Sequence, residues 1–473
     1  MYSNRRVFMK GLGGTCLGAA GSRYSRAFAQ SASANSVPAP AESGIDHIVI
    51  VTMENRSFDH LLGWLPNANG IPNWLTYPDP SGARHLVYSL APDYTGCSHP
   101  DPDHSYDGSR ICYDGGTMQG FLLDTSNDVY CIGYYNASDI PFYAALAQTY
   151  TACDNWHAAI LGPTFPNRMF IWAAQTDRLG DTFELSSLPT IFDALDAANI
   201  SHRYYFNNVP YLALWGLKYV SSTALYANFL SDAATGNLPA VSFVDPRYTV
   251  LDDGTGNDDH PHADIRNGDA FLSQVYHALA AGPNWANTVL IVMFDEWGGF
   301  FEHVAPPRVV APANSPDQDL VDGAALLGFR VPTVIASPFT KAIPGQPNPV
   351  DHALYDHTSA LKLIEWRWGL PPLTARDSSG AIGNPATNFN FNSPDASVPA
   401  LPMPHEVFAR PCFSGLSGGL FDASNPASSG QQSRTQTQSA TRQNEFAGLD
   451  KSTLVRDFVD HPHIQSLAKQ SFK

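Results

Sequence analysis

Positive charge is scarce in this 473-residue sequence, and the scarcity limits what the protein can bind. There are 27 Lys and Arg residues against 44 Asp and Glu, which gives a formal net charge of −17. Five of the basic residues lie in residues 1–29, which contain no acid, so the rest of the chain is more acidic still. A protein that binds the phosphate backbone of nucleic acids needs a basic surface. We therefore expect no nucleic-acid partner.

Long apolar runs and cysteines are also scarce. Beyond residue 29, no stretch reaches the roughly 18 apolar residues that cross a bilayer, so we expect no transmembrane segment and at most peripheral membrane contact. Cys97, Cys112 and Cys131 predict one or two disulfides in an oxidising compartment, with a pairing that their spacing does not reveal. Cys153 lies in an apolar neighbourhood and is expected to be a small buried side chain.

The first residues have the features of an export signal. Residues 4–10 (NRRVFMK) contain the paired arginines, aromatic residue and lysine of a twin-arginine signal. A segment of small residues follows, and Ala27-Phe28-Ala29 fits an A-x-A cleavage site. The sequence therefore predicts a signal peptide over 1–29, export by the twin-arginine machinery, and a periplasmic or secreted protein. The alternative is a basic N-terminal segment without a sorting role.

Strands and helices are expected to alternate along most of the chain. The predicted strands are 45–52, 202–206, 240–244, 289–294 and 331–336, and the predicted helices are 141–150, 166–176, 190–198, 264–281 and 357–368. This alternation predicts an α/β fold with three layers, α/β/α, around a central, mostly parallel sheet. The expected organisation is a linker at 30–43, one large domain at 44–400 with a loop-rich insertion at 66–130, and an extension at 401–473. Within the extension, 423–445 is low-complexity and 449–468 is a candidate helix.

Two of the predicted strands end in acidic residues. An apolar run before Glu54 and Asn55, and another before Asp295 and Glu296, read as buried strands. Because ligands of open α/β sheets bind at the carboxyl ends of the strands, these side chains are expected to gather around one cation. Oxygen ligands suit Mg, Ca or Mn, and Zn remains open. The plainer alternatives are an acidic turn at Asp295 and a helix cap at Glu54.

Thr164 stands before a predicted helix. Pro166 suits a first helical turn, because the N–H that proline lacks is not needed there. Thr164 would then lie beside a helix N-terminus, where free N–H groups favour phosphoryl oxygens. A threonine hydroxyl becomes a nucleophile only when a cation or a base lowers its pKa. The alternative role is a plain N-cap.

Five histidines lie in polar motifs and are candidates for proton transfer. They are His104, His260, His262, His303 and His357. Ester cleavage needs one group to protonate the leaving oxygen, and a second histidine could hydrogen-bond the phosphoryl group. The alternative for each is an ordinary loop or helix-cap residue.

Several separated motifs, in one order, together resemble a known family. They are 54–60 (ENRSFDH), 101–105 (DPDHS), 132–143, 162–168 (GPTFPNR), 260–261 (HP), 295–299 (DEWGG), 331–333, 337–338 and 355–357 (YDH). The chain resembles the bacterial phosphoesterases that include phosphocholine-type phospholipases C and secreted acid phosphatases, within the alkaline-phosphatase-like superfamily. The resemblance covers about residues 45 to 370 and implies that 44–400 is a phosphoesterase catalytic domain.

The resemblance also implies roles for particular residues. One divalent metal would be bound by Glu54, Asn55, Thr164, Asp295 and Glu296. Thr164 would be transiently phosphorylated, and the catalytic histidines would be His104, His260 and His303. Asn55, His104 and His260 would contact the substrate.

Two positions depart from what is common in the family. Trp297 stands where many relatives have histidine, and Phe165 where a polar residue or histidine is common, so either could alter the choice of head group. Recognition of choline would need an aromatic cage. Candidates are Tyr134, Tyr135, Trp156 and Trp297, with core packing as the alternative for each.

The function implied is that of an exported, metal-dependent phosphoric-ester hydrolase of the phospholipase C type, which cleaves phospholipids or phosphocholine-type esters through a phosphothreonine. One alternative is an acid phosphatase that acts on small phosphomonoesters. Another is a catalytically silent protein that binds lipid or a surface. A sulfatase is disfavoured, because no Cys or Ser in a sulfatase-type maturation motif replaces Thr164.

Overall fold

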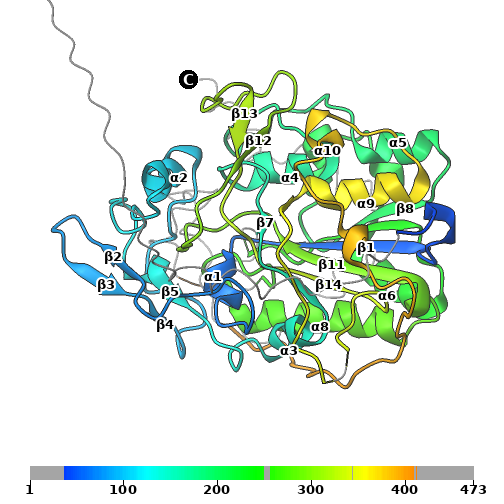
Figure 1. Ribbon diagram of the computed structural model, residues 1–473, viewed down its shortest axis with the longest axis horizontal. Helices are drawn as coiled ribbons and strands as arrows, with labels where there is room; N and C mark the ends of the chain where they lie inside the picture. The colour runs from blue at the N-terminus through cyan, green and yellow to red at the C-terminus, as the bar shows by residue number, and fades with distance from the viewer. Residues whose placement is uncertain (1–36, 250–255, 344, 410–411, 413–473) are drawn as a thin grey trace, which may run out of the picture. The chain divides into compact units, whose positions relative to one another are not determined.

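The computed structural model describes residues 37–249, 256–343, 345–409 and 412 (Figure 1). Three of the expected segments lie outside the described residues: the signal peptide at 1–29, the low-complexity segment at 423–445 and the candidate helix at 449–468. Among the described residues, no helix combines the length and the apolar character that crossing a membrane requires.

An eight-stranded sheet forms the middle layer, with the order β15-β6-β14-β11-β1-β10-β8-β9. Its strands are β1 (His47–Met53), β6 (Thr151–Cys153), β8 (His202–Phe206), β9 (Thr223–Leu225), β10 (Val241–Val244), β11 (Thr288–Phe294), β14 (Thr333–Ala336) and β15 (Val350–Asp351). The five strands from β11 to β9 are parallel, and β14 is antiparallel to both of its neighbours. The predicted, mostly parallel sheet is confirmed.

Helices cover both faces of this sheet (Figure 1). On one face lie α4 (Thr164–Ala173), α5 (Ile191–Ala197), α9 (Thr358–Trp368) and α10 (Ala375–Ser378), and on the other α3 (Pro141–Thr149), α6 (Tyr226–Thr235) and α8 (Ile265–Ala281). The three-layer α/β/α fold predicted from the sequence is therefore confirmed. All ten predicted strands and helices are present, and α4 begins at Thr164, two residues earlier than expected.

Short elements complete the chain. They are the helices α1 (Phe58–Leu62) and α2 (Tyr106–Tyr113) and the strands β2 (Thr76–Pro78), β3 (Arg84–Leu86), β4 (Tyr88–Ser89), β5 (Gly133–Tyr134), β7 (Trp156–His157), β12 (Arg308–Val310), β13 (Ala324–Leu326) and β16 (Tyr355–Asp356). The 3₁₀ turns are Pro40–Glu42, Asp114–Gly116, Val129–Ile132, Tyr211–Trp215, Val220–Ser222, Trp285–Asn287 and Pro385–Asn388. Most of the predicted insertion, 66–130, consists of loops between these pieces.

The two central strands are apolar because helices cover both of their faces. Every residue of β11 is buried, as are six of the seven in β1. The two strands run parallel, and Met53 lies opposite Phe294 at their carboxyl ends. This register brings Glu54 and Asp295, the next residue of each chain segment, to the same edge of the sheet. The local apolar pattern thus determines where the acidic residues meet.

The disulfide prediction is wrong. Cys97 is bonded to Cys412, 315 residues away, and not to Cys112 or Cys131. Cys112 and Cys131 are free and buried in an apolar cluster, where burial raises the pKa of both thiols. Cys153 is free and buried, as expected. Spacing misled the prediction because the partner of Cys97 belongs to the C-terminal extension.

Candidate active site

The loops after β1 and β11 bring four predicted ligands together. Asn55 donates its backbone N–H to Oδ1 of Asp295 at 3.1 Å, and the N–H of Glu296 donates to the same oxygen at 2.8 Å. Gly298, with a φ of 65°, lets the second loop pack against the first, because a Cβ there would lie 2.0 Å from the carbonyl oxygen of Asn55. Close packing of the two loops therefore explains why glycines follow the acidic residues.

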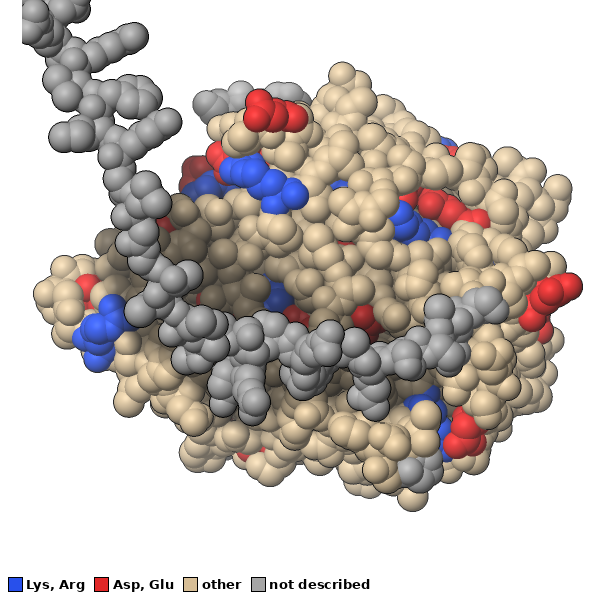
Figure 2. Space-filling view, in the orientation of Figure 1, with Lys and Arg blue, Asp and Glu red and all other residues tan. Residues whose placement is uncertain are grey.

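Thr164 joins this group from helix α4. It is the first residue of the helix, its side chain is buried, and its Oγ1 donates to Oδ1 of Asn55 at 3.4 Å. The structure thus brings the five predicted metal ligands, Glu54, Asn55, Thr164, Asp295 and Glu296, to one edge of the sheet. In the orientation of Figure 1, the surface is hollowed over the region to the left of the β1 label, with acidic and basic atoms at its floor (Figure 2).

A buried arginine is the main counter-charge of these acids. Arg168 lies one turn beyond Thr164 on α4, and its guanidinium donates to Glu54 at 3.0 Å, Asp245 at 2.8 Å and Asp295 at 3.1 Å. Buried charges are tolerated when they are paired and hydrogen-bonded. One guanidinium facing three carboxylates leaves the group short of positive charge.

The pKa values of Glu54 and Glu296 show the effect of this shortage of positive charge. Burial raises the pKa of Glu54, and Asp295 adds to the rise while Arg168 opposes it. Burial also raises the pKa of Glu296, where His104 opposes the rise and Asp295 adds to it. Oε2 of Glu296 accepts the N–H of Gly298 at 2.7 Å, whereas the buried Oε1 has no hydrogen-bond partner among the described residues. An unpartnered carboxylate oxygen among crowded oxygen donors fits a hard divalent cation.

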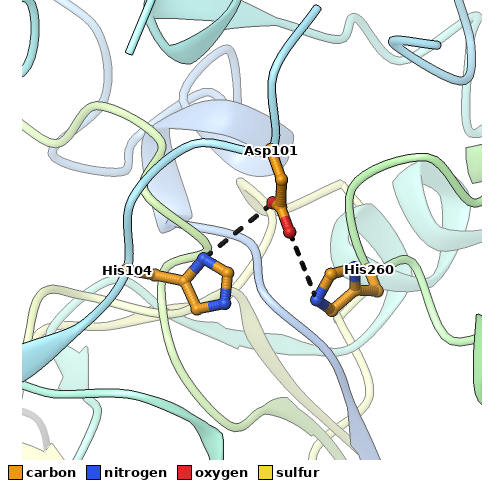
Figure 3. A group of neighbouring side chains, drawn as sticks. All are labelled: Asp101, His104 and His260. Atoms are coloured by element: carbon orange, nitrogen blue, oxygen red, sulfur yellow. Dashed lines mark ion pairs between the residues drawn. The ribbon is translucent and has the colours of Figure 1, made fainter. Parts of the chain in front are cut away.

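Two of the predicted histidines lie beside the group, and Asp101 lies between them (Figure 3). Nε2 of His104 is 3.2 Å from Nδ2 of Asn55 and 4.0 Å from Oε1 of Glu296. The carboxylate of Asp101 is 4.0 Å from Nδ1 of His104 and 3.9 Å from Nε2 of His260. Burial opposes protonation of His104, but Glu296 and Asp101 outweigh it and raise its pKa to about 9.

His303 lies in a different cluster. Its Nδ1 donates to Asp59 at 2.6 Å, and Arg330 pairs with Asp59 at 3.2 Å and with Glu302 at 2.7 Å. This buried ion network holds the segment after β11 against α1. The described contacts of His303 are with this network and with Asn69. The structure thus places His104 beside Asn55 and Glu296, with His260 next to it across Asp101, and places His303 in another group.

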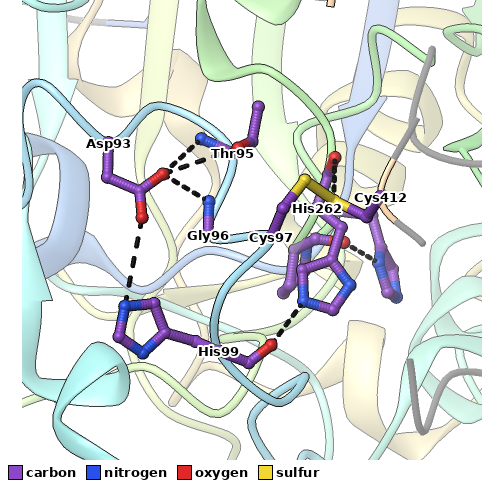
Figure 4. Close-up of a disulfide and its surroundings, with 9 residues drawn as sticks. Asp93, Thr95, Gly96, Cys97, His99, His262 and Cys412 are labelled. Atoms are coloured by element: carbon purple, nitrogen blue, oxygen red, sulfur yellow. Dashed lines mark hydrogen bonds and ion pairs between the residues drawn. A yellow bond between two sulfur atoms is a disulfide. The ribbon is translucent and has the colours of Figure 1, made fainter. Parts of the chain in front are cut away.

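The remaining two histidines support loops of the site. His357 donates from Nε2 to the backbone carbonyl of Asp295 at 2.6 Å. His262 donates from Nε2 to the carbonyl of His99 at 3.1 Å, and its own carbonyl faces Cys412 of the disulfide (Figure 4). The disulfide therefore joins the C-terminal extension to the two loops that carry His104 and His260.

The four aromatic candidates for a choline cage differ in how deeply they are buried. Tyr135, Trp156 and Trp297 are buried in the core, and the ring of Trp297 packs edge-on against Phe329 at 5.1 Å between centroids. Tyr134 is partly exposed. Core packing, the alternative considered for each, is confirmed for the three buried residues.

Sequence reasoning assigned no role to four acidic or basic residues of the site. They are Asp101, Arg168, Asp181 and Asp245. Asp101 and Arg168 fall within motifs of the resemblance. Asp101 lies three residues before His104, and Arg168 lies four residues after Thr164, and this spacing could have identified both as site residues. Asp181 and Asp245 have no local signal, because only the fold brings them to α4.

The chain is similar to several known proteins. The model of the Phosphoesterase family matches residues 45–371. Non-specific phospholipase C6 of Arabidopsis thaliana is 30% identical over 445 residues, which cover 83% of this chain and 84% of that protein. Phospholipase C A of Mycobacterium tuberculosis is 30% identical over 76% of this chain and 80% of its own length. A protein in the alkaline phosphatase superfamily from Vibrio parahaemolyticus aligns over 74% of this chain and 73% of its own, with a TM-score of 0.36 and 12% identity.

The family match covers more than half of the chain, and the resemblance inferred from the motifs is confirmed. The chain therefore belongs to the Phosphoesterase family and is a hydrolase of phosphoric esters.

Proposed function

We propose that this protein is an exported, metal-dependent phosphodiesterase of the phospholipase C type, which cleaves phospholipids or phosphocholine-type esters through a phosphothreonine. The observation that carries the proposal is the hydroxyl of Thr164, 3.4 Å from Oδ1 of Asn55 at the point where two buried strands end in acids. The names of the relatives, phospholipases C from a plant and a mycobacterium, support the substrate class.

The ion proposed would be held by the oxygen donors of Glu54, Asn55, Thr164, Asp295 and Glu296, of which Oε1 of Glu296 accepts no hydrogen bond. When bound, it would lower the pKa of the threonine hydroxyl and offset negative charge on the phosphoryl group. The site contains acids in excess and one unpartnered carboxylate oxygen, and both features support such an ion. Recovery of activity after chelation identifies the ion among Mg, Ca, Mn and Zn.

The reaction proceeds in two displacements. The hydroxyl of Thr164 releases its proton to solvent, Oγ1 attacks phosphorus in line, and the bond to the alcohol, diacylglycerol for a phospholipid, breaks. His104 holds a proton beside the group and donates it to the departing oxygen. Water then attacks the phosphothreonine and gives a proton to a histidine. The P–Oγ1 bond breaks, Oγ1 takes a proton from solvent to restore the threonine hydroxyl, and the phosphorylated head group leaves. The side-chain amide of Asn55 and the dipole of α4 stabilise charge on the phosphoryl oxygens.

The test compares p-nitrophenyl phosphorylcholine, a diester, with p-nitrophenyl phosphate, a monoester. We expect faster turnover of the diester, loss of activity with a chelator, and recovery with one of the four ions. Thr164→Ala is expected to reduce kcat by about 10⁴-fold or more. Thr190→Ala is the matched control, because Thr190 is the buried N-cap of α5 and its loss removes the cap and a hydrogen bond to Tyr219, both away from the site. Faster monoester turnover would instead support the acid phosphatase.

Export by the twin-arginine pathway is part of the proposal. It is supported by the motif at residues 4–10 and by the Cys97–Cys412 disulfide, which suits an oxidising compartment. Replacing Arg5 and Arg6 by lysine should keep the protein in the cytoplasm of a host with that pathway. Equal export of both forms, measured by fractionation, would contradict it.

A further inference from the structure

Helix α4 begins with few free backbone donors. An α-helix leaves its first N–H groups without partners in the helix. Here the first two residues are Thr164 and Phe165, and the third, Pro166, has no N–H to offer. The carboxylate of Asp181 accepts the N–H of Phe165 at 2.7 Å. The carboxylate of Asp181 therefore accepts an N–H beside Thr164 that could otherwise bind an anionic oxygen of the substrate.

Asp181 is fixed in this position by its own loop. The ring of Phe183 packs edge-on against the ring of Phe165, with 5.1 Å between centroids. The guanidinium of Arg178 donates to the carbonyl of Thr182, which closes the loop around Asp181. Asp181 itself is largely enclosed, with only part of its surface exposed. The contact with Phe165 is thus part of an ordered loop that covers the N-terminus of α4.

The charge of Asp181 acts on the groups that surround Thr164. The Asp181 carboxylate contributes to the raised pKa values of both His104 and Glu296. In turn, burial is the main cause that raises the pKa of Asp181 to about 6, so that the carboxylate is ionised at neutral and alkaline pH. Any phosphoryl group attacked by Thr164 lies within the field of this carboxylate.

We propose that Asp181 is a specificity-determining residue that favours phosphodiesters over phosphomonoesters. The inference rests on the proposed function and concerns the same site. A diester carries one negative charge on two non-bridging oxygens, whereas a monoester dianion carries two charges on three. Repulsion by the fixed carboxylate grows with the charge of the substrate. The occupied N–H of Phe165 also leaves the third oxygen of a monoester without that donor.

The test replaces the charge and keeps the hydrogen bond. In Asp181→Asn, the amide oxygen can still accept the N–H of Phe165. We expect kcat/KM for p-nitrophenyl phosphate to rise about tenfold at pH 8, while that for p-nitrophenyl phosphorylcholine changes less than about threefold. Asp177→Asn is the matched control, because Asp177 lies in the same loop, is exposed and pairs with Arg178. Equal changes for both esters, or the same shift in the control, would overturn the proposal.

Binding gives a second readout that does not depend on turnover. Titration calorimetry at pH 8 with inorganic phosphate, a dianion, should show about tenfold tighter binding to Asp181→Asn than to wild type, and dimethyl phosphate should show little difference. If the wild type hydrolyses neither ester, the proposed function fails, and this comparison still decides the role of Asp181. Equal phosphate affinities would overturn the role of Asp181 even in an active diesterase.

Discussion

Nε of Arg168 donates to Oδ2 of Asp295 at 3.1 Å, and both side chains are buried. The same guanidinium also meets Glu54 and Asp245, so one positive charge serves three negative ones. Arg168 lies one helical turn beyond Thr164, on the same face of α4. The proposed nucleophile and the counter-charge of the site are therefore positioned by one short helix. The excess of negative charge that remains is what a divalent ion would balance.

Removing the charge of Arg168 should destabilise the protein strongly. Arg168→Met leaves three buried carboxylates without their partner, and breaking a buried ion pair from one side costs about 3–5 kcal/mol. Urea denaturation should show a loss of this size in the free energy of unfolding. Lys218→Met is the control, because Lys218 pairs with Asp193 at 2.9 Å with both side chains more than one third exposed, and a surface pair contributes less than about 1 kcal/mol. Similar losses in the two variants would contradict the buried network.

Asp101 should act as a positioning residue for the two histidines. Its carboxylate lies within 4.0 Å of both rings and contributes to the raised pKa of His104 (Figure 3). We expect Asp101→Asn to lower kcat for the diester by about 10–100-fold, since a misplaced general acid loses most of its effect, and to leave KM nearly unchanged. Asp103→Asn, in which the amide can still accept the N–H of Ser105, should retain both constants. A parallel rise of KM in Asp101→Asn would indicate a role in binding instead.

The disulfide should stabilise the folded protein measurably. Cys97–Cys412 closes a loop of more than 300 residues, and disulfides typically contribute about 2–4 kcal/mol. Cys97→Ser, Cys412→Ser and the double variant should lose the same free energy of unfolding, because each removes the same bond. Wild type in reductant should match them. Additive losses in the double variant would show that the two cysteines act independently.

Much of the fold followed from local patterns. The apolar runs that become β1 and β11, and the helical spacing of α8, identify elements because each pattern reflects burial on the sheet or on one helix face. The meeting of Glu54 with Asp295 also followed, since parallel strands end at a common edge. The position of Thr164 could be predicted from Pro166 because proline is tolerated in a first turn.

Other features depend on contacts between distant segments and have no local signature. Cys412 pairs with Cys97 across the whole catalytic region, so cysteine spacing pointed to nearer partners. Asp181 reaches Phe165 only because its loop folds back over α4. His303 lies seven residues after Glu296, and yet the chain turns away and pairs it with Asp59. Composition and spacing cannot show the direction of such turns.

Glu365 on α9 should make stability depend on pH. Burial, and then the neighbouring Asp377, raise the pKa of Glu365 to about 9, although Lys362 opposes the rise. The folded state therefore keeps a proton that the unfolded chain releases at its ordinary, lower pKa. Because the folded state binds more protons in this window, the free energy of unfolding falls as the pH rises from about 4.5 towards 9.

Glu365→Gln tests this dependence, because the amide resembles the protonated acid and has no charge to bury. We expect the variant to gain about 1–3 kcal/mol over wild type at pH 8 and nothing at pH 4, measured by urea denaturation at both values. Glu42→Gln, at an exposed position, should show no gain at either pH. A gain of equal size at pH 4 and pH 8 would show that packing, and not the protonation of Glu365, causes the effect. A loss at pH 8 would mean that the ionised Glu365 stabilises the fold.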